Sequence, residues 1–317
     1  MAGKKVFITG VSGYLGTRLC LELDRLGWCE KIFGMDLIKP LYKYDKLEFR
    51  KMDINDPALV EWAREIKPDI LVHLAYILEQ LHNLEKMRRI NYDGSLNALQ
   101  AAARAETPQL LFASSGTAYG ARPDNPVELK ESDPLKPNPG FFYAVDKARM
   151  ETALQEFSRE RPQTIVSVIR PCVVYGPNVN NYLSDLLDMP ILTGFRGLNP
   201  RLQFVHEDDV ARAIIFILEK NAPGFFNIAP PDTTSLEEMF QRARKLSVML
   251  PNPLMNLLVS VFWHSRIPLF RISPAFLDYL RYPWVMNSSR LTGLGFQYRY
   301  STNETIEIML RVKELMD

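Results

Sequence analysis

Two residues whose types and spacing could do chemistry lie in the run YAVDK, residues 143–147. Tyr143 and Lys147 are four positions apart, so on a helix their side chains share one face. An ammonium group beside a phenol favours the phenolate, which matters because tyrosine ordinarily ionises near pH ~10. The pair could therefore move a proton at neutral pH, although Tyr-x-x-x-Lys also occurs on ordinary surface helices.

A pair of serines, Ser114 and Ser115, follows the apolar run QLLFA. The carboxyl end of a parallel strand is where α/β sheets place their ligands. A serine there could hydrogen-bond a substrate hydroxyl or carbonyl, although serines at strand ends are commonly turns or caps. The functional interpretation gains weight because Tyr143 and Lys147 follow within the next strand–helix unit.

A glycine-rich loop, GVSGYLG, lies between the first predicted strand and the first predicted helix. Its glycines permit a tight turn and close backbone approach to a pyrophosphate, at which the helix N-terminus directs free N–H groups. The spacing Gly-x-x-Gly-x-x-Gly in this context predicts a dinucleotide site. The residues expected to contact the dinucleotide here are Gly10, Gly13, Tyr14, Leu15 and Gly16.

Asp36 ends the second predicted strand, 20 residues after Gly16. A carboxylate there accepts hydrogen bonds from the adenosine ribose and repels a 2′-phosphate, so we expect NAD rather than NADP. Lys39 is the residue that could reverse this preference. Asp53 and Ile54 could hold the adenine, although Asp53 could equally be an acidic residue at the start of the next helix.

Six short β-rich runs alternate with helical patterns through the first 230 residues. This alternation, with continuously apolar strands, predicts a Rossmann-type, doubly wound parallel α/β sheet and a smaller, mostly helical C-terminal substrate lobe. We expect helices over 14–26, 57–66, 80–105 and 143–160. The NAD-binding domain is predicted to span 1–176 and about 203–230, and the substrate lobe about 177–202 and 231–317.

The composition excludes several classes of protein. A formal net charge of +1 on 317 residues argues against a nucleic-acid partner. The cysteines, Cys20, Cys29 and Cys172, lack metal-ligand spacing, so we expect no metal and a cytoplasmic protein with reduced thiols. No signal peptide or transmembrane segment is expected. The most apolar stretch, 254–270, is predicted to be a buried helix or pocket wall rather than a lipid-facing patch.

A series of motifs resembles the extended short-chain dehydrogenases/reductases, the group typified by nucleotide-sugar epimerases and dehydratases. The resemblance is strong over about residues 4–230 and loose beyond. The matching elements are TGVSGYLG (9–16), Asp36, DIND (53–56), VHLAY (72–76), NYDGSLNALQAA (91–102), SSGTAYG (114–120), YAVDK (143–147), RPCVVYGPN (170–178), QFVHEDDVARAI (203–214) and FNIA (226–229).

The resemblance implies a role for each matching residue. It implies that Tyr143 is the catalytic acid/base, that Lys147 binds the nicotinamide ribose and lowers the tyrosine pKa, and that Ser115 positions the reacting oxygen. Asn91 would brace the active-site helix region, while Pro171, Val173 and Val174 would lie beside the nicotinamide. Further implied cofactor contacts are Leu74, Ala75, Tyr76 and Ser114. Implied substrate contacts are Ser115, Gly116, Thr117, Asn178, Phe204 and Arg281.

The sequence departs from the family where the substrate binds. The diphosphate-binding arginine of sugar epimerases is replaced by Leu202, with Arg201 one position away, and the Gly-Asp expected after Arg281 is absent. Gly116 and Thr117 replace the acids of the 4,6-dehydratases, so we do not expect dehydration. The apolar residues of the lobe could form its core or line a pocket for a less polar substrate; they are Leu254, Leu257, Leu258, Val261, Phe262, Trp263, Leu269 and Phe270.

The leading hypothesis is an NAD-dependent, homodimeric, epimerase-like enzyme acting on a small molecule such as a nucleotide sugar. The second is a dissociating NAD(P)-dependent alcohol/ketone oxidoreductase for a more apolar, steroid-like or acyl-like substrate. A minor third is a non-catalytic NAD-sensing protein. His73 follows a strand and could contact the backbone or a cofactor ribose, or be a structural histidine.

Overall fold

A computed structural model describes residues 3–78, 81–179, 189–265 and 273–314 of the chain. The contacts between residues divide the chain into two compact units. Unit 1 comprises Met1–Ser114, Asp146–Arg170 and Glu207–Phe226, and unit 2 comprises Ser115–Val145, Pro171–His206 and Asn227–Asp317. The domain boundaries expected from the sequence stay a prediction.

Unit 1 is built on a seven-stranded sheet with the order β11-β6-β5-β4-β1-β2-β3. The pairings from β6 to β3 are all parallel. Continuous burial of β4 and β5 is what a parallel sheet covered on both faces requires. The strands are β1 (Lys4–Thr9), β2 (Cys29–Asp36), β3 (Leu47–Lys51), β4 (Ile70–His73), β5 (Gln109–Ala113), β6 (Ile165–Pro171) and β11 (Gly224–Ile228).

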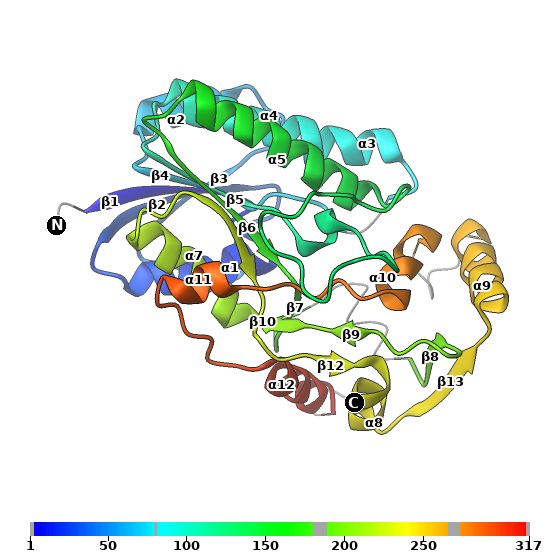
Figure 1. Ribbon diagram of the computed structural model, residues 1–317. Coiled ribbons are helices and arrows are strands. Elements are labelled where there is room, and N and C mark those ends of the chain that lie inside the picture. The colour runs from blue at the N-terminus through cyan, green and yellow to red at the C-terminus, as the bar shows by residue number, and fades with distance from the viewer. Residues whose placement is uncertain (1–2, 79–80, 180–188, 266–272, 315–317) are drawn as a thin grey trace. The chain divides into compact units, whose positions relative to one another are not determined.

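Helices cover both faces of this sheet. Figure 1 shows α2, α4 and α5 on one face and α1 and α7 on the other. Under the first group lies a core in which Trp62 packs edge-on against Phe7, with ring centroids 4.8 Å apart. The helices are α1 (Tyr14–Arg25), α2 (Ala58–Ile66), α3 (Leu84–Arg88), α4 (Gly94–Arg104), α5 (Phe142–Glu160) and α7 (Glu207–Glu219). The predicted doubly wound fold is confirmed.

The region expected to form one helix over 80–105 contains three consecutive pieces. A π-helical turn, η1 (Arg89–Asp93), separates α3 from α4. At the start of α4, a Cβ on Gly94 would lie 2.6 Å from the Ile54 side chain, so only glycine permits this close packing. The wider turn is a local insertion that hydrophobic periodicity does not reveal.

The described residues of unit 2 form three two-stranded sheets in addition to helices. They pair β7 (Val173–Tyr175) with β10 (Phe204–His206), β9 (Arg201–Leu202) with β12 (Thr234–Ser235), and β8 (Ile191–Phe195) with β13 (Leu246–Leu250). The helices are η2 (Gly116–Tyr119), α8 (Leu236–Ala243), α9 (Asn252–Ser265), η3 (Pro274–Phe276), α10 (Leu277–Arg281), α11 (Ser289–Gly293) and α12 (Thr302–Glu314).

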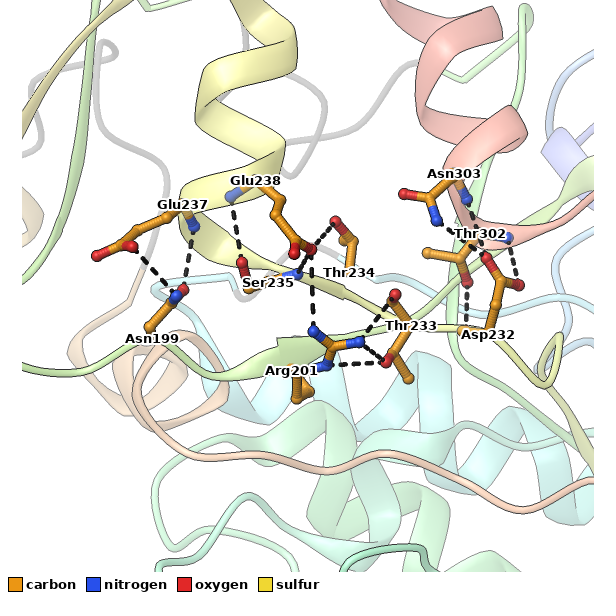
Figure 2. A network of polar contacts seen from close by, with 10 residues as sticks. All are labelled: Asn199, Arg201, Asp232, Thr233, Thr234, Ser235, Glu237, Glu238, Thr302 and Asn303. Atoms are coloured by element: carbon orange, nitrogen blue, oxygen red, sulfur yellow. Dashed lines mark hydrogen bonds and ion pairs between the residues drawn. The ribbon is translucent and has the colours of Figure 1, made fainter.

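A polar network holds several of these short elements together (Figure 2). Ser235 and Glu238 form a capping box that starts α8. The Asp232 carboxylate accepts the Thr302 N–H at 2.8 Å and so starts α12. Arg201 donates from Nη2 to the Thr233 hydroxyl at 2.6 Å. Hydrogen bonds of this kind fix short elements that have little local propensity of their own.

Candidate active site

The glycine loop of unit 1 is shaped for close approach of a ligand. Gly10 has φ +76°, and a Cβ there would lie 2.5 Å from the Ala75 nitrogen. A Cβ on Gly16 would clash with the Gly10 carbonyl oxygen. Gly13 provides the N-cap of α1 without a side-chain hydrogen bond, and the first turn, which begins with Tyr14 and Leu15, has no acidic residue. The free N–H groups at this helix start therefore fit an anionic phosphate.

Asp36 lies at the end of β2, beside this loop. Its Oδ2 accepts a hydrogen bond from the Ser12 N–H at 3.1 Å, and its Oδ1 accepts one from the Ile38 N–H at 3.2 Å. Both donors are backbone groups, so the carboxylate is positioned without being neutralised by a cationic side chain in these contacts. This fits the expected recognition of ribose hydroxyls.

Asp53 and Ile54 lie in the turn that precedes α2. Asp53 is exposed and accepts the Asn55 N–H at 2.9 Å, whereas Asp56 accepts the N–H of Ala58 at the helix start. Asp53 therefore closes the turn, and the acid at the helix start is Asp56. The buried Ile54 packs against Gly94.

The segment after β4 carries Leu74, Ala75 and Tyr76. Asn91, from η1, accepts the Ile77 N–H at 2.8 Å and donates to the Ile77 carbonyl at 3.0 Å. The resemblance implied that Asn91 braces the active-site helix region. In the structure its buried amide fixes the backbone directly after Tyr76.

His73 is buried between Thr9 and Ser95, with hydrogen bonds of 2.7 and 3.0 Å. Burial and, as the smaller cause, the positive charge of Lys147 together lower the pKa of His73 to about 3. Of the interpretations left open by the sequence, these contacts fit a neutral, structural histidine.

Lys147 lies on the part of α5 that belongs to unit 1. Its Nζ donates to the Ala113 carbonyl at 2.5 Å and lies 3.3 Å from the centroid of the Tyr76 ring. Burial holds the pKa of Lys147 well below its ordinary value. Lys147 therefore loses its proton more readily than a surface lysine, because burial disfavours the charged form.

Ser114 hydrogen-bonds to a buried cluster of charged side chains that the sequence did not reveal. Its hydroxyl donates to Glu151 Oε1 at 2.5 Å, and the same carboxylate binds the Arg170 guanidinium from Nε at 3.0 Å and Nη2 at 2.5 Å. Glu151 and Arg170 are both buried. The sequence signal for this cluster was the position of Glu151 four residues after Lys147, which places both side chains on one face of α5. These contacts distinguish Ser114 from its neighbour Ser115.

In unit 2, Ser115 and Tyr143 are brought together. The two side chains form a hydrogen bond that lowers the pKa of Tyr143, but burial outweighs it and raises the pKa to about 12. Ser115 Oγ also accepts hydrogen bonds from the Thr117 hydroxyl at 2.9 Å and the Thr117 N–H at 3.2 Å. Tyr143 and Lys147 both lie on α5, one helical turn apart, as their spacing predicts.

The remaining predicted cofactor and substrate contacts lie at separate places in unit 2. Gly116 packs so closely that a Cβ would lie 2.6 Å from Met286 Sδ. Pro171 ends β6, Val173 begins β7, and Asn178 is exposed in the turn after β7. Phe204 is buried and stacks on Tyr175, with ring centroids 4.7 Å apart.

Two arginines considered as phosphate ligands are engaged within unit 2. Arg281 donates to Asp278 at 2.6 Å and to Asn256 at 2.8 Å. Arg201 donates to Thr233, as Figure 2 shows. A diphosphate would therefore have to compete with these partners.

Unit 2 also encloses an apolar cavity of about 150 Å³. Tyr279, in its wall, donates its hydroxyl to the Thr117 carbonyl at 2.7 Å and packs on Phe141, with centroids 5.3 Å apart. The wall is therefore in direct contact with the η2 segment that follows Ser115. The cavity is lined mainly by apolar side chains, among them Val173, Leu192, Phe195, Phe204, Leu236, Phe240, Met255, Leu258, Val259, Phe262, Phe276 and Trp284.

The lobe residues singled out in the sequence divide into four groups. Leu258 and Phe262 line the cavity, whereas Leu254, Leu257 and Val261 are exposed. Trp263 is partly buried. Leu269 and Phe270 lie outside the described residues.

The sequence predicts neither a metal site nor a transmembrane helix, and both predictions concern features that can be searched for among the described residues. Among those residues, no group of three or more His, Cys, Asp or Glu side chains could hold a metal ion. No helix there is long and apolar enough to cross a membrane.

Residues 6–229 match the family described as the NAD dependent epimerase/dehydratase family. Vestitone reductase of Medicago sativa is 28% identical over 266 residues, covering 75% of this chain and 79% of that protein. An uncharacterized protein of Mycobacterium tuberculosis is 24% identical over 320 residues, covering 98% and 85%.

Solved structures share the fold across the whole chain. The UDP-glucose 4-epimerase of Thermus thermophilus, in complex with NAD, has a TM-score of 0.77 at 20% identity, covering 98% of this chain and 99% of that one. The UDP-glucose 4-epimerase of Thermotoga maritima, with UDP-glucose, has a TM-score of 0.76 at 17% identity, covering 99% and 100%.

Proposed function

This chain belongs to the NAD dependent epimerase/dehydratase family, and we propose that it transfers hydride between a substrate carbinol or carbonyl carbon and NAD. The observation that carries the proposal is the hydrogen bond between Ser115 and Tyr143 at the start of the helix that bears Lys147. A hydroxyl, a phenol and an ammonium in this order are the groups that alcohol oxidation needs.

The residues of the chain would handle the proton. Ser115 would hold the substrate oxygen, and Tyr143 would take its proton on oxidation and return it on reduction. With a pKa of about 12, only about one phenol in 10⁵ is ionised at pH 7. A neighbouring positive charge must therefore lower this pKa in the working enzyme, and Lys147 is the group that we assign to this task.

The cofactor would be held by unit 1. The glycine loop and the α1 N-terminus fit a pyrophosphate, and Asp36 fits the adenosine ribose of NAD. The backbone of Leu74, Ala75 and Tyr76, fixed through Asn91, would form the wall next to them. Bound NAD supplies the hydride acceptor of the oxidation.

A nucleotide sugar is the first candidate substrate. Solved structures of this fold include epimerases crystallised with UDP-glucose. In such a reaction the ketone intermediate would rotate within the site and be reduced on its other face, with Tyr143 returning the proton. The family resemblance also favours a homodimer for this enzyme.

An apolar alcohol or ketone is the second candidate, and the cavity in unit 2 favours it. The cavity of about 150 Å³ is lined mainly by hydrocarbon and aromatic side chains, and its wall contacts the segment that follows Ser115. A dry cavity of this size accepts a group as large as benzene. One relative, vestitone reductase, is named for a reduction. Arg201 and Arg281 already have partners in unit 2, which weakens the argument for a diphosphate.

The deciding experiment identifies the nucleotide that the protein carries. The full chain is purified without added cofactor and denatured, and the released nucleotide is identified by chromatography and mass spectrometry. Stoichiometric NAD would favour an epimerase, which has no need to release its cofactor between turnovers. Weak, reversible NAD binding would favour the oxidoreductase.

Two outcomes would count against the proposal. Recovery of NADP would overturn the role given to Asp36, and failure to bind either nucleotide would overturn hydride transfer itself. A non-catalytic NAD sensor is tested by Tyr143→Phe, because a sensor would keep its NAD-dependent behaviour, whereas an enzyme would lose its turnover.

A further inference from the structure

Lys147 is a buried cation, and its burial works against the role that the proposed function gives it. The residue is 3% exposed, and burial holds the pKa of Lys147 well below its ordinary value. Burial of this kind favours the neutral amine over the ammonium. Because the proposed function needs a positive charge to serve Tyr143, other groups of the chain must offset this effect.

The titratable groups around Lys147 come from β4, from the segment after it and from α5 itself. His73, at the end of β4, is neutral, and Tyr76 presents its ring to the ammonium, with 3.3 Å between Nζ and the ring centroid. On α5, the carboxylates of Glu151 and Asp146 act against the burial and raise the pKa of Lys147. The counter-charge is therefore to be found on the helix that carries the lysine.

The two carboxylates on α5 differ in how firmly they are held. Burial raises the pKa of Asp146, and within the described residues neither of its carboxylate oxygens has a hydrogen-bond partner. The Glu151 carboxylate, in contrast, is bound by the guanidinium of Arg170 through Nε at 3.0 Å and Nη2 at 2.5 Å. Glu151 is therefore the better fixed of the two.

Glu151 is also tied to the backbone that receives the Lys147 ammonium. Lys147 donates from Nζ to the Ala113 carbonyl at 2.5 Å, and the next residue, Ser114, donates its hydroxyl to Glu151 Oε1 at 2.5 Å. Lys147 and Glu151 lie one turn apart on α5. Two hydrogen bonds from successive residues therefore fasten the end of β5 to one face of the helix.

The neighbouring strand holds the same two points. Arg170, at the end of β6, binds the carboxylate of Glu151, and the Ser114 N–H donates to the Ile169 carbonyl at 2.8 Å. All four of these residues are buried. A buried network whose members have partners keeps one geometry, because each bond that breaks leaves a polar group unpaired.

We propose that Glu151 is a positioning residue for Lys147: through Ser114 it holds the Ala113 carbonyl against the ammonium, and its carboxylate keeps the lysine charged. Glu151 takes no part in the chemistry itself. The inference deepens the proposed function and rests on it, since it takes Lys147 to be the charge that serves Tyr143.

Carbon-13 NMR of the lysine Cε atoms, in the full chain without added nucleotide, tests the proposal. The Cε shift follows the charge on the adjoining Nζ, and Lys147→Arg identifies the signal of Lys147 by removing it. We expect Lys147 to be charged at pH 7 in the wild type. Ser114→Ala, which keeps the ion pair of Glu151 with Arg170, should lower the pKa of Lys147 by at least about 0.5, and Glu151→Gln by at least about 1.

The matched control is Ser167→Ala, which removes another buried hydroxyl of unit 1, together with its hydrogen bond to the Ala222 carbonyl at 2.7 Å. It should lower the melting temperature about as much as Ser114→Ala and leave the pKa of Lys147 unchanged. If Glu151→Gln does not fold, Ser114→Ala decides alone.

Three results would overturn the proposal: a neutral Lys147 at pH 7 in the wild type, an unchanged pKa of Lys147 in Ser114→Ala, or an equal shift in Ser167→Ala. The titration needs neither nucleotide nor substrate. A chain that bound neither NAD nor NADP would therefore refute hydride transfer, whereas the role of Glu151 would still be decided by the pKa of Lys147.

Discussion

Units 1 and 2 both bury aromatic rings, but within the described residues the buried acidic, lysine and arginine side chains lie in unit 1. Unit 1 buries charge, each group held by specific partners, as in the Glu151–Arg170 pair and the contact of Lys147 with the Ala113 carbonyl. Unit 2 buries aromatic rings, such as Phe276 and Tyr279, around an apolar cavity. Buried charges tolerate little change because losing one partner leaves the other unpaired, whereas apolar walls can be reshaped at lower cost. Unit 1 is therefore the more constrained of the two, and the apolar wall of unit 2 can change at lower cost.

The largest effect is expected from Tyr143→Phe in unit 2, which removes the proton carrier. Turnover should fall about 10²–10⁴-fold, the usual contribution of general acid–base catalysis. The amount of NAD bound should stay the same, because the contacts that we assign to the cofactor lie mainly in unit 1. Turnover is measured by absorbance of the reduced cofactor and NAD by mass spectrometry.

The control for this change is Tyr42→Phe, which removes a phenol at an exposed position of unit 1. It should leave both quantities unchanged. If Tyr143→Phe kept near-normal turnover, Tyr143 would not be the acid/base.

The next largest effect is expected from Glu151→Gln in unit 1, which leaves the buried Arg170 without its carboxylate. Breaking a buried ion pair in this way costs about 3–5 kcal/mol of unfolding free energy. Urea unfolding measures the loss. Glu156→Gln, at an exposed position of the same helix, should cost less than about 0.5 kcal/mol. Similar values for the two variants would show that the pair does not stabilise unit 1.

A smaller effect, dependent on pH, is expected from His73→Gln. Since the folded pKa of His73 is about 3 and the ordinary value is about 6.5, only the unfolded state takes up a proton as pH falls between these values. Stability present above about pH 6.5 is therefore lost towards lower pH, at up to about 1.4 kcal/mol per pH unit.

His73→Gln removes this proton uptake, so its unfolding free energy should fall less steeply than that of the wild type between about pH 6 and 4. Urea unfolding at several pH values gives both slopes. His264→Gln, on the exposed side of α9, is the matched control. Equal slopes for His73→Gln and the wild type would mean that His73 is protonated in the folded protein.

The smallest effect is expected from Tyr279→Phe in the cavity wall. It removes the hydrogen bond to the Thr117 carbonyl at 2.7 Å and the acceptor of the Asn138 N–H, and should cost about 1 kcal/mol of unfolding free energy. The ring and the apolar wall remain. Thermal unfolding measures the change, with Tyr42→Phe again as the control. A loss as large as that of Glu151→Gln would contradict the view that unit 2 depends on apolar packing.

Much of unit 1 could be predicted because its signals are local. The first helix was expected over 14–26 and spans Tyr14–Arg25, and the second was expected over 57–66 and spans Ala58–Ile66. The helix expected over 80–105 was broken by η1, since one wide turn shifts the register without changing the residue pattern. In the second unit, β13 was missed because its five residues pair with β8, more than fifty positions earlier in the chain.

The sequence by itself determined the glycine loop, the acid that follows it and the one-turn spacing of Tyr143 and Lys147. These features depend on backbone conformation and helical periodicity within a few residues. Only the tertiary structure decided that Ser114 binds Glu151 whereas Ser115 meets Tyr143, and that a cavity lies behind Tyr279. Those outcomes depend on side chains from distant segments, whose packing no local pattern records.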